Sequence, residues 1–557
     1  MKKLLIIILV AATTLAHADL SKVSPDLQTY SGTQARVIVQ YNQAPSLLDL
    51  QTITGLLGSI VNSLPLVNGL VANLPLSSIL SLSNQSDVKY ISLDRSLSPT
   101  LSNAAPAVNA FAAWQSGYTG AGIGVAVVDS GISSHPDLNG FLGLSRVVYS
   151  QTFVPGTWSA SDQYGHGTHI AGLIAGDGAN STGWKYSRTF EGIAPDANLI
   201  NLRVLDQNGV GSDSAVIAAI SQAISLKFLY NIRVMNLSLG RPVYESYHLD
   251  PVCQAVEAAW KSGIVVVVAA GNNGRYLPTS GYGTITSPGN DPYVITVGAM
   301  KPMGTPTRTD DLIASYSSKG PSAIDHVIKP DVVAPGNLLV SLEAPGTLYN
   351  EYPGNRVPYS FYVVGGSSSS STSYFTLSGT SMAAGVVSGA VADLLQKSPS
   401  LSPDQVKARL MKTAWKSFPA SSSVTDPTTG VTYTDQYDVF TIGAGYIDVE
   451  AALNSTDVAS RNAMSPTATH NSTSGQVLLT SDPSAVWNTS SVWTTSAVWG
   501  NSQFLSGSNA MWGSNAMWGS STQDGFSTIW AGNAMWGSNA MWGSNAMWGS
   551  NASAGEQ

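Results

Sequence analysis

Three residues of the chain carry the side-chain types that together can transfer an acyl group. Asp129 ends the apolar run VAVVD, His166 stands in GHGTHIAG, and Ser381 stands in SGTSMAAG. A serine hydroxyl is a weak nucleophile until a histidine accepts its proton, and the histidine needs a carboxylate to fix its tautomer and stabilise its cation. The three types therefore predict nucleophilic acyl transfer, provided that the fold brings them together.

Two other hydrolytic chemistries do not fit these motifs. His169 follows His166 by three residues, but the pair lacks the glutamate of H-E-x-x-H and a nearby third ligand, so a zinc protease is excluded. His169 is expected to pack or hydrogen-bond beneath the site. An α/β-hydrolase would show G-x-S-x-G and the order Ser, acid, His, whereas this chain has G-T-S-M-A and the order Asp, His, Ser.

The elements that must position these residues form an α/β pattern. Four runs are almost continuously apolar: GIGVAVVD (122–129), ANLINLRVL (197–205), IRVMNLSL (232–239) and GIVVVVAAG (263–271). Helical patterns such as 213–229 lie between them. Strands that are hydrophobic on both faces and separated by helices predict a mostly parallel central sheet with helices on both faces. Ligands of such sheets bind beyond the carboxyl ends of the strands, where Asp129 stands.

Composition excludes several classes of protein. The 557 residues are 43% hydrophobic and 11% charged, too apolar for a disordered chain. The formal net charge is −8 and no cluster of Lys and Arg occurs, so no nucleic-acid partner is expected. Cys253 is the one cysteine, so no internal disulfide can form, and we interpret it as a small buried hydrophobe.

The chain is expected to contain four parts. Residues 1–18 combine Lys2 and Lys3, an apolar run and a small-residue cleavage site, and predict a secretory signal peptide, the alternative being an uncut anchor. Residues 19–103 predict a small α+β domain with strands at 35–41 and 88–94 and helical material between them. The Ser/Pro/Ala stretch at 96–107 reads as an exposed linker. The main domain covers 104–453, and residues 454–557 form a Ser/Thr/Asn-rich linker and a Trp-rich tail.

The tail repeats a unit close to N-A-M-W-G-S. Its tryptophans follow one another at intervals of six within three groups, and no Lys or Arg occurs after residue 461. An even period places every tryptophan on one face of an extended chain. A stacked β-solenoid, a strip that binds a cell surface or a polysaccharide, and a flexible low-complexity tail all fit this pattern.

Four motifs in fixed order, VAVVDSGI, GHGTHIAG, AAGNNG and SGTSMAAG, resemble the signatures of the subtilisin-like serine proteases, the subtilases. The resemblance covers about 105–453. It implies that Asp129 orients the histidine, that His166 is the general base and then acid, and that Ser381 is the nucleophile. Asn272 would stabilise the oxyanion together with the Ser381 backbone N–H, and the neighbouring Asn273 would be structural.

The resemblance also implies how a substrate binds. Two edges, Gly209-Val210-Gly211 and Ser238-Leu239-Gly240, would hold an extended peptide by strand addition. Ala270 and Gly271 would line the primary specificity pocket, and their small size suggests a roomy apolar slot.

The family pattern makes residues 19–103 an inhibitor-type propeptide, so that a secreted endopeptidase would be produced as a self-processed zymogen. Its partners would be protein or peptide substrates and its own propeptide. No cofactor is required for the chemistry. Structural calcium is common in subtilases, with Asp137 and Asp177 as candidate ligands and a solvated loop carboxylate as the alternative for each. The competing function is a subtilase-fold surface or binding protein that acts mainly through its tail.

Three departures from the family pattern stand near the site. Ala384-Gly385 replace the usual Pro-His after GTSMA, for which we expect altered packing and unchanged chemistry. Tyr164 stands where a small polar residue is common, which affects the adjoining subsite. Arg241 replaces a frequent glycine and is expected to add a positive charge near the substrate groove.

Overall fold

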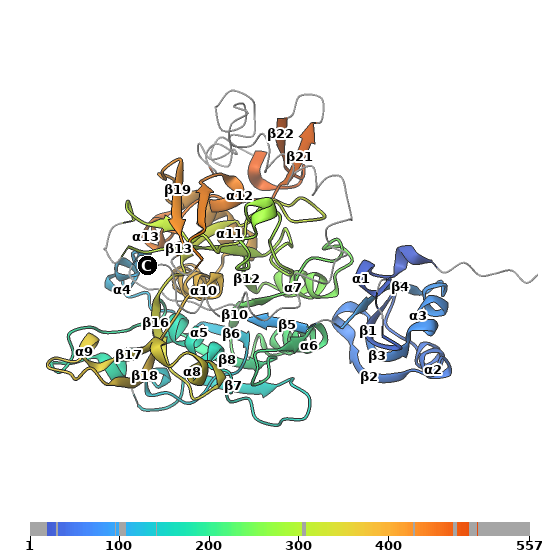
Figure 1. The fold of residues 1–557 in the computed structure, drawn as a ribbon, viewed down its shortest axis with the longest axis horizontal. Coiled ribbons are helices and arrows are strands. Elements are labelled where there is room, and N and C mark those ends of the chain that lie inside the picture. Colours follow the sequence, from blue (N-terminus) through green and yellow to red (C-terminus); the bar gives the residue numbers. More distant parts are fainter. Residues whose placement is uncertain are drawn as a thin grey trace, which may run out of the picture. The chain divides into compact units, whose positions relative to one another are not determined.

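The computed structural model describes residues 19–488, apart from 29, 31, 95, 100–106, 141, 304–307, 427–428 and 472–475, together with Val498 (Figure 1). The chain divides into two compact units, Met1–Asp94 and Arg95–Gln557. The expected signal peptide at 1–18 and the tryptophans from Trp493 onward lie outside the described residues. Within the described part, no helix is long and apolar enough to cross a membrane.

The first unit is a four-stranded antiparallel sheet in the order β2-β3-β1-β4, with α2 and α3 beside it. The predicted strands at 35–41 and 88–94 are confirmed as β1 and β4, but the stretch between them is not only helical. It contains the β2–β3 hairpin, which turns at Asn68 in the left-handed region (φ 50°). Asn-Gly between apolar runs is a hairpin signal that could have shown this. The elements are α1 (Pro25–Gln28), β1 (Gln34–Tyr41), α2 (Leu47–Gly55), β2 (Ser59–Leu64), β3 (Gly69–Pro75), α3 (Leu76–Ser83) and β4 (Val88–Leu93).

The second unit is built on an eight-stranded sheet, in the order β14-β13-β12-β10-β6-β8-β7 with β15 also paired to β13. Every pair is parallel except β13–β14. The four predicted apolar strands are confirmed as β6, β8, β10 and β12. The bounds are β6 (Gly124–Asp129), β7 (Val147–Thr152), β8 (Asn198–Arg203), β10 (Ile232–Leu237), β12 (Val265–Ala269), β13 (Ile295–Lys301), β14 (Leu312–Ile313) and β15 (Val332–Pro335).

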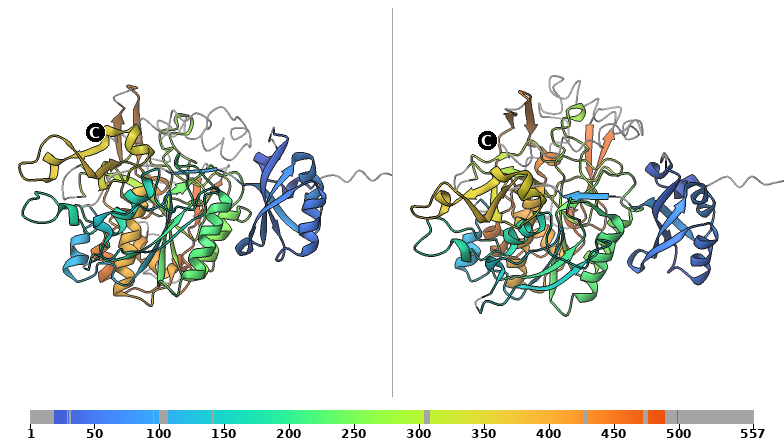
Figure 2. Two further views of the ribbon diagram at one scale, coloured as in Figure 1. Left: turned by 90° about the horizontal axis from the view of Figure 1, so that it is seen from below. Right: turned by 60° about the horizontal axis from the view of Figure 1, so that its bottom comes forward.

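Helices cover both faces of this sheet (Figure 2). α5 (His166–Ala175) packs with α10 (Thr380–Lys397), and α6 (Asp213–Leu226) packs with α7 (Pro251–Lys261). The Ser212 side chain accepts the Ala215 N–H and so caps α6, and Asp250 caps α7 ahead of Pro251. The remaining elements are β5 (Ser96–Pro99), α4 (Ala110–Gln115), β9 (Gly211–Ser212), β11 (Leu239–Gly240), β16 (Leu339–Leu342), α8 (Thr347–Glu351), β17 (Arg356–Pro358), α9 (Tyr359–Tyr362), β18 (Ser370–Leu377), α11 (Pro403–Thr413), β19 (Ser421–Thr425), β20 (Thr432–Gln436), α12 (Val439–Ile442), α13 (Val449–Asn454), β21 (Thr467–Asn471) and β22 (Gln476–Thr480).

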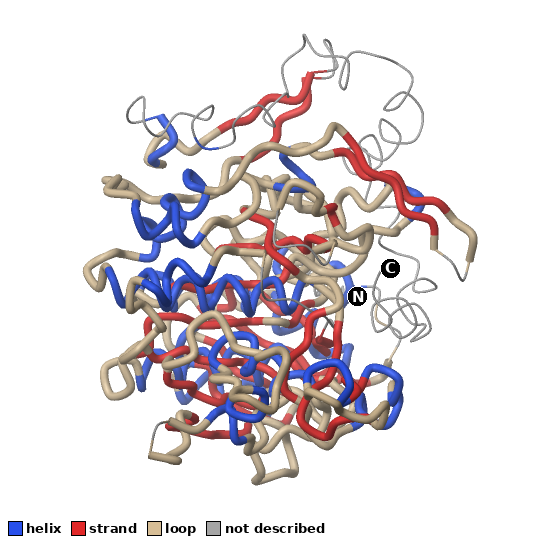
Figure 3. Tube along the Cα trace, turned by 90° about the vertical axis from the view of Figure 1, so that its left-hand side faces the viewer, coloured by secondary structure: helices blue, strands red, loops and turns tan. Residues whose placement is uncertain are grey.

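α10, the longest helix of the described chain, packs against α5. Figure 3 shows how helices and strands lie side by side in this part of the protein. A Cβ at Gly385 would lie 3.7 Å from the Ile170 side chain, and one at Gly389 would lie 3.3 Å from the Ile174 carbonyl oxygen. Gly385 and Gly389 follow Ser381 by one and two turns, and Ile170 and Ile174 follow His166 by the same intervals. The two helices therefore run parallel and in register, and their first turns lie side by side.

The packed chain continues past residue 453, where the main domain was expected to end. The Ser465 N–H donates to the Pro292 carbonyl (2.9 Å), and its hydroxyl donates to Asp331 (2.5 Å). Trp487, the first tryptophan of the repeats, is fully buried and donates its indole N–H to the Met464 carbonyl (2.7 Å). The packed part of the second unit therefore includes Ser465 and Trp487.

We expect Trp487→Ala to lower the free energy of unfolding by about 3–5 kcal/mol, because it removes a fully buried aromatic side chain and leaves a cavity. Denaturant unfolding in a Ser381→Ala background, which prevents self-digestion, measures the change. Trp158→Ala is the matched control, since that side chain is 99% exposed. Equal stability of the two variants, or a chain ending at Ser455 as stable as one ending at Asn488, would contradict the packed role of this segment.

Candidate active site

Asp129 and His166 meet where β6 ends and α5 begins. The Asp129 Oδ1 lies 2.8 Å from the His166 Nδ1, and both side chains are almost completely buried. A carboxylate only accepts, so Nδ1 carries the proton, and Nε2 is the ring nitrogen that can accept a proton from another group. Gly167 allows this approach, because a Cβ there would lie 2.2 Å from the Gly131 carbonyl oxygen.

The turn before α5 is fixed by a buried aspartate that sequence reasoning missed. Asp162 Oδ1 accepts the N–H groups of Tyr164 and Gly165, while Oδ2 accepts the N–H and the hydroxyl of Thr168. These contacts satisfy donors that a helix N-terminus leaves without partners. An aspartate just ahead of a helix is a capping signal and could have indicated this role. Asp162 therefore holds the backbone from which His166 projects.

Ser381 is the second residue of α10, at the same end of the paired helices as His166. Its Oγ lies 3.2 Å from the Ser238 carbonyl oxygen, and the Ser238 hydroxyl donates to the Ser381 carbonyl (2.6 Å). Ser381, the predicted nucleophile, is thus joined to Ser238, the first residue of one of the two predicted substrate edges. At the N-terminus of an 18-residue helix, the helix dipole favours negative charge and the first backbone N–H groups have no partner within the helix.

Asn272 is held with its amide oxygen turned inward. Its Oδ1 accepts the N–H of Thr380 and the Thr380 hydroxyl, each at 2.9 Å. A backbone N–H can only donate, so the atom that it meets must be the oxygen, and this assigns the amide orientation. The Asn272 Nδ2 is buried and makes no hydrogen bond within the described chain. Thr380 also accepts the Gly271 N–H (3.0 Å), so this threonine, which sequence reasoning missed, orients the amide donor.

The two predicted substrate edges lie on either side of a segment of the chain itself. β5 pairs antiparallel with β11 on one side, with Leu239 opposite Pro99, and with β9 on the other side, with Gly211 opposite Leu97. The prediction of an exposed linker is therefore wrong for residues 96–99. A Ser/Pro-rich stretch carries no strand signal of its own, and it is extended here because edges on both sides supply backbone partners.

The small residues at the site serve close packing. A Cβ at Gly209 would lie 2.7 Å from the Tyr164 ring, so the unusual Tyr164 does adjoin the first edge. A Cβ at Gly271 would lie 2.8 Å from the Ser318 Oγ and 2.9 Å from the Thr286 side chain. The glycine is thus required for packing as well as for its positive φ of 107°. The size of the primary pocket remains a prediction.

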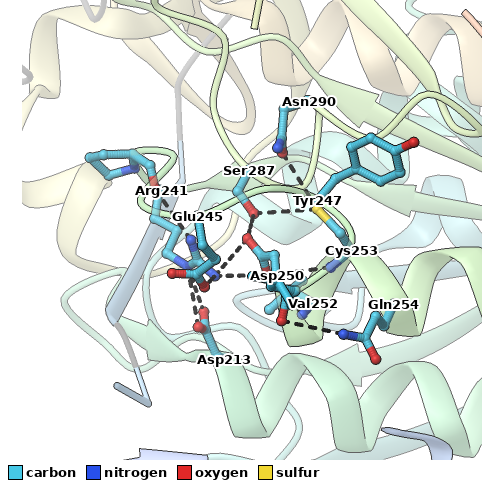
Figure 4. A network of polar contacts seen from close by, with 12 residues as sticks. Asp213, Arg241, Glu245, Tyr247, Asp250, Val252, Cys253, Gln254, Ser287 and Asn290 are labelled. Carbon is cyan, nitrogen blue, oxygen red and sulfur yellow. Dashed lines mark hydrogen bonds and ion pairs between the residues drawn. The ribbon is translucent and has the colours of Figure 1, made fainter. Parts of the chain in front are cut away.

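Arg241 does not add a free positive charge to the groove, which corrects the expectation from its sequence position. Its side chain is buried, and its guanidinium contacts the carboxylates of Asp213 and Asp250 (Figure 4). Burial of an arginine requires such partners; Asp250 lies nine residues away in the sequence and Asp213 lies 28 residues away.

His169 and Cys253 take the structural roles expected of them. His169 is completely buried, its Nε2 faces the Phe375 carbonyl (3.1 Å), and burial lowers its pKa to about 3. It is therefore neutral and lies in the core beneath the site. Cys253 is fully buried on α7, and burial raises the pKa of its thiol.

The two candidate calcium ligands have protein partners. The Asp137 carboxylate accepts the Asn180 N–H (2.9 Å) and the Tyr374 hydroxyl (2.7 Å), which engages both oxygens. Asp177 accepts the Ala179 N–H (2.9 Å), and burial raises its pKa. No group of three or more His, Cys, Asp and Glu side chains in the described chain could hold a metal ion. These contacts account for Asp137 without an ion, and a role of either residue in calcium binding remains a prediction.

Comparisons with known proteins agree with the family resemblance of the four sequence motifs. The profile of the Subtilase family matches residues 120–445. Serine protease AprX of Bacillus subtilis (strain 168) is 39% identical over 341 residues, which cover 59% of this chain and 70% of AprX. Subtilisin E of the same organism is 34% identical over 425 residues, which cover 74% of this chain and 94% of subtilisin E.

A solved structure shares the fold. Fervidolysin from Fervidobacterium pennivorans, described as a keratinolytic enzyme related to subtilisin, superposes with a TM-score of 0.53 at 23% identity. The match covers 77% of this chain and 62% of fervidolysin. The mostly parallel sheet, the motifs at its carboxyl edge and these relatives all agree. The chain belongs to the subtilase family and is a subtilisin-like serine protease.

Proposed function

We propose that the chain is a secreted endopeptidase made as a zymogen, with Asp129, His166 and Ser381 as its catalytic triad. The observation that carries this proposal is the orientation of Asn272. A buried amide nitrogen without a partner is costly in a folded protein. Here Thr380 fixes that nitrogen in place beside the N-terminus of α10, so it is prepared to donate to a charge that develops during the reaction.

The reaction follows from the protonation states. Because the Asp129 carboxylate accepts a hydrogen bond from the His166 Nδ1–H, His166 can take the Ser381 hydroxyl proton at Nε2. The Ser381 Oγ then attacks the scissile carbonyl carbon, and the oxyanion is stabilised by the Asn272 Nδ2–H and the Ser381 N–H. His166 donates its proton to the leaving amine, which gives an acyl-enzyme, and water attacks this ester by the same route in reverse.

The first unit is proposed to be an inhibitory propeptide. Residues up to Asp94 fold around a core of their own that includes Val37, Val39 and Ile91, and β5 follows after a single residue. β5 supports the proposal because it occupies the position of an extended peptide between the two edges. Secretion rests on the sequence pattern of residues 1–18.

The competing function, a binding protein that acts through its tail, is not favoured, because the groups required for catalysis are all present. Attachment of the tail to a cell surface or polysaccharide remains a prediction from its sequence, since the repeats after the first lie outside the described residues.

Ser381→Ala is expected to abolish cleavage of casein and to leave the N-terminal unit attached, because maturation would use the same nucleophile. The test is expression of the variant alone in a protease-deficient host, followed by measurement of its intact mass. A normally shortened Ser381→Ala protein would show that another protease performs the processing.

Asn272→Leu is expected to lower kcat by about 10²–10³-fold with little change in KM, the range known for oxyanion-hole donors in this family. Asn273→Leu is the matched control at the next position and should change kcat far less. If Asn272→Leu raised KM and left kcat unchanged, Asn272 would be a substrate-binding residue and not the oxyanion donor.

The register of β5 supports a proposal for the processing site. Gly240 pairs with Ser98 and Leu239 with Pro99, the last described residue of β5. Ser238 precedes Leu239, and its carbonyl oxygen lies 3.2 Å from the Ser381 Oγ, so the bond attacked would follow closely after Pro99. We therefore propose cleavage between Thr100 and Leu101, a little before the boundary expected at 103.

N-terminal sequencing of the mature wild-type enzyme is expected to begin at Leu101. The released N-terminal fragment, measured by mass spectrometry before it is degraded, should end at Thr100. A single cut elsewhere, such as after Asp94, would mean that β5 does not lie between the edges as the substrate of processing.

A further inference from the structure

Each substrate edge is followed directly by one member of a buried ion pair. Asp213 follows the last residue of β9, and Arg241 follows the last residue of β11. The Arg241 Nε lies 3.0 Å from Asp213 Oδ1 and 3.2 Å from Oδ2. Both side chains are almost completely buried. The two edges pair with β5 and not with each other, so this ion pair is a side-chain link between the residues that directly follow them.

The guanidinium is held rigidly on its other side. The Arg241 Nη2 lies 2.9 Å from each oxygen of Asp250, and the Glu245 carboxylate is 3.9 Å away (Figure 4). The Arg241 backbone exchanges two hydrogen bonds with Ser287, whose hydroxyl donates to Asp250 (2.7 Å). Arg241 therefore cannot shift without breaking contacts to the N-terminus of α7 and to the Ser287 loop. Asp213 thus contacts a guanidinium whose position is fixed.

The separation of the edges matters because a peptide between them must pair on both sides. Neighbouring strands lie about 4.8 Å apart, so the two edges must be held about two such spacings from each other. Backbone hydrogen bonds have a narrow range of distance, and a change of about 1 Å in this separation would lose the bonds on one side. A fixed contact between β9 and β11 is therefore needed to set the distance between the two edges.

We propose that the Arg241–Asp213 ion pair is a positioning device that sets the separation of the two substrate edges and so gives the enzyme its preference for peptides long enough to pair with both. This proposal rests on the proposed mode of peptide binding between the edges. An arginine suits the role because its planar fork can engage two carboxylates in fixed geometry, whereas a lysine is a single point charge on a flexible stem.

The test compares two substrates of the full-length, self-processed enzyme. One is a tetrapeptide p-nitroanilide, which extends along both edges, and the other is an acetylated single-residue ester, which reaches only the pocket next to Ser381. Two variants weaken the ion pair. Asp213→Asn removes the negative charge and places an amide NH2 donor against the guanidinium N–H donors. Arg241→Lys keeps the positive charge but loses the planar guanidinium that contacts two carboxylates. Asp426→Asn is the control, because the buried Asp426 carboxylate pairs with Arg275 (2.8 Å) and follows β19, whereas neither residue belongs to β9 or β11.

We expect Asp213→Asn and Arg241→Lys to lower kcat/KM for the tetrapeptide by about tenfold, mainly through KM, and to change kcat/KM for the ester by less than about twofold. Asp426→Asn should lower the melting temperature comparably and affect both substrates equally little. Equal losses on the two substrates, or no loss on either, would overturn the proposal. A wild-type enzyme that cleaved neither substrate would instead contradict the proposed function, so the two failures are distinguishable.

Discussion

The parallel contact between α5 and α10 is the constraint on which the rest of the site depends. His166 is the first residue of α5 and Ser381 the second residue of α10, so the position of one helix along the other determines whether these two residues lie at the same level. Gly389 permits the close approach of α10 to α5, and Gly167 permits the close approach of α5 to the turn after β6. The positions of Asp129, His166 and Ser381 therefore depend on places where a side chain is absent.

The sequence predicted the parts of this arrangement that are local. Apolar strands, their order with the helices and the residues at their ends follow from patterns within short windows, and β6, β8, β10 and β12 appear where those patterns stand. Asn272 was assigned by resemblance, and the structure adds that Thr380 orients it. Asp162 had a capping signal that was overlooked.

What could not be predicted depends on contacts between distant segments. Arg241 reads as an exposed cation because its carboxylate partner Asp213 stands 28 residues away and packs against it only in the folded chain. Residues 96–99 read as a linker because their strand conformation comes from β9 and β11 and not from their own composition. Trp487 reads as one repeat among many, and its burial depends on the Met464 segment that it contacts in the folded chain.

The arrangement of β5 has a consequence for which proteins can be attacked. β9 and β11 are each only two residues long, and the segment between them has backbone partners on both sides. A strand inside a folded sheet already has both sides engaged, and a helix has its backbone groups bonded within itself. Neither a paired strand nor a helix can bind between β9 and β11 until its own backbone hydrogen bonds have broken. In the proposed mode of peptide binding, selection between β9 and β11 would therefore act on conformation before it acts on side chains. The rate at which a target protein is cut would then be governed by how often its chain opens locally into a free, extended segment.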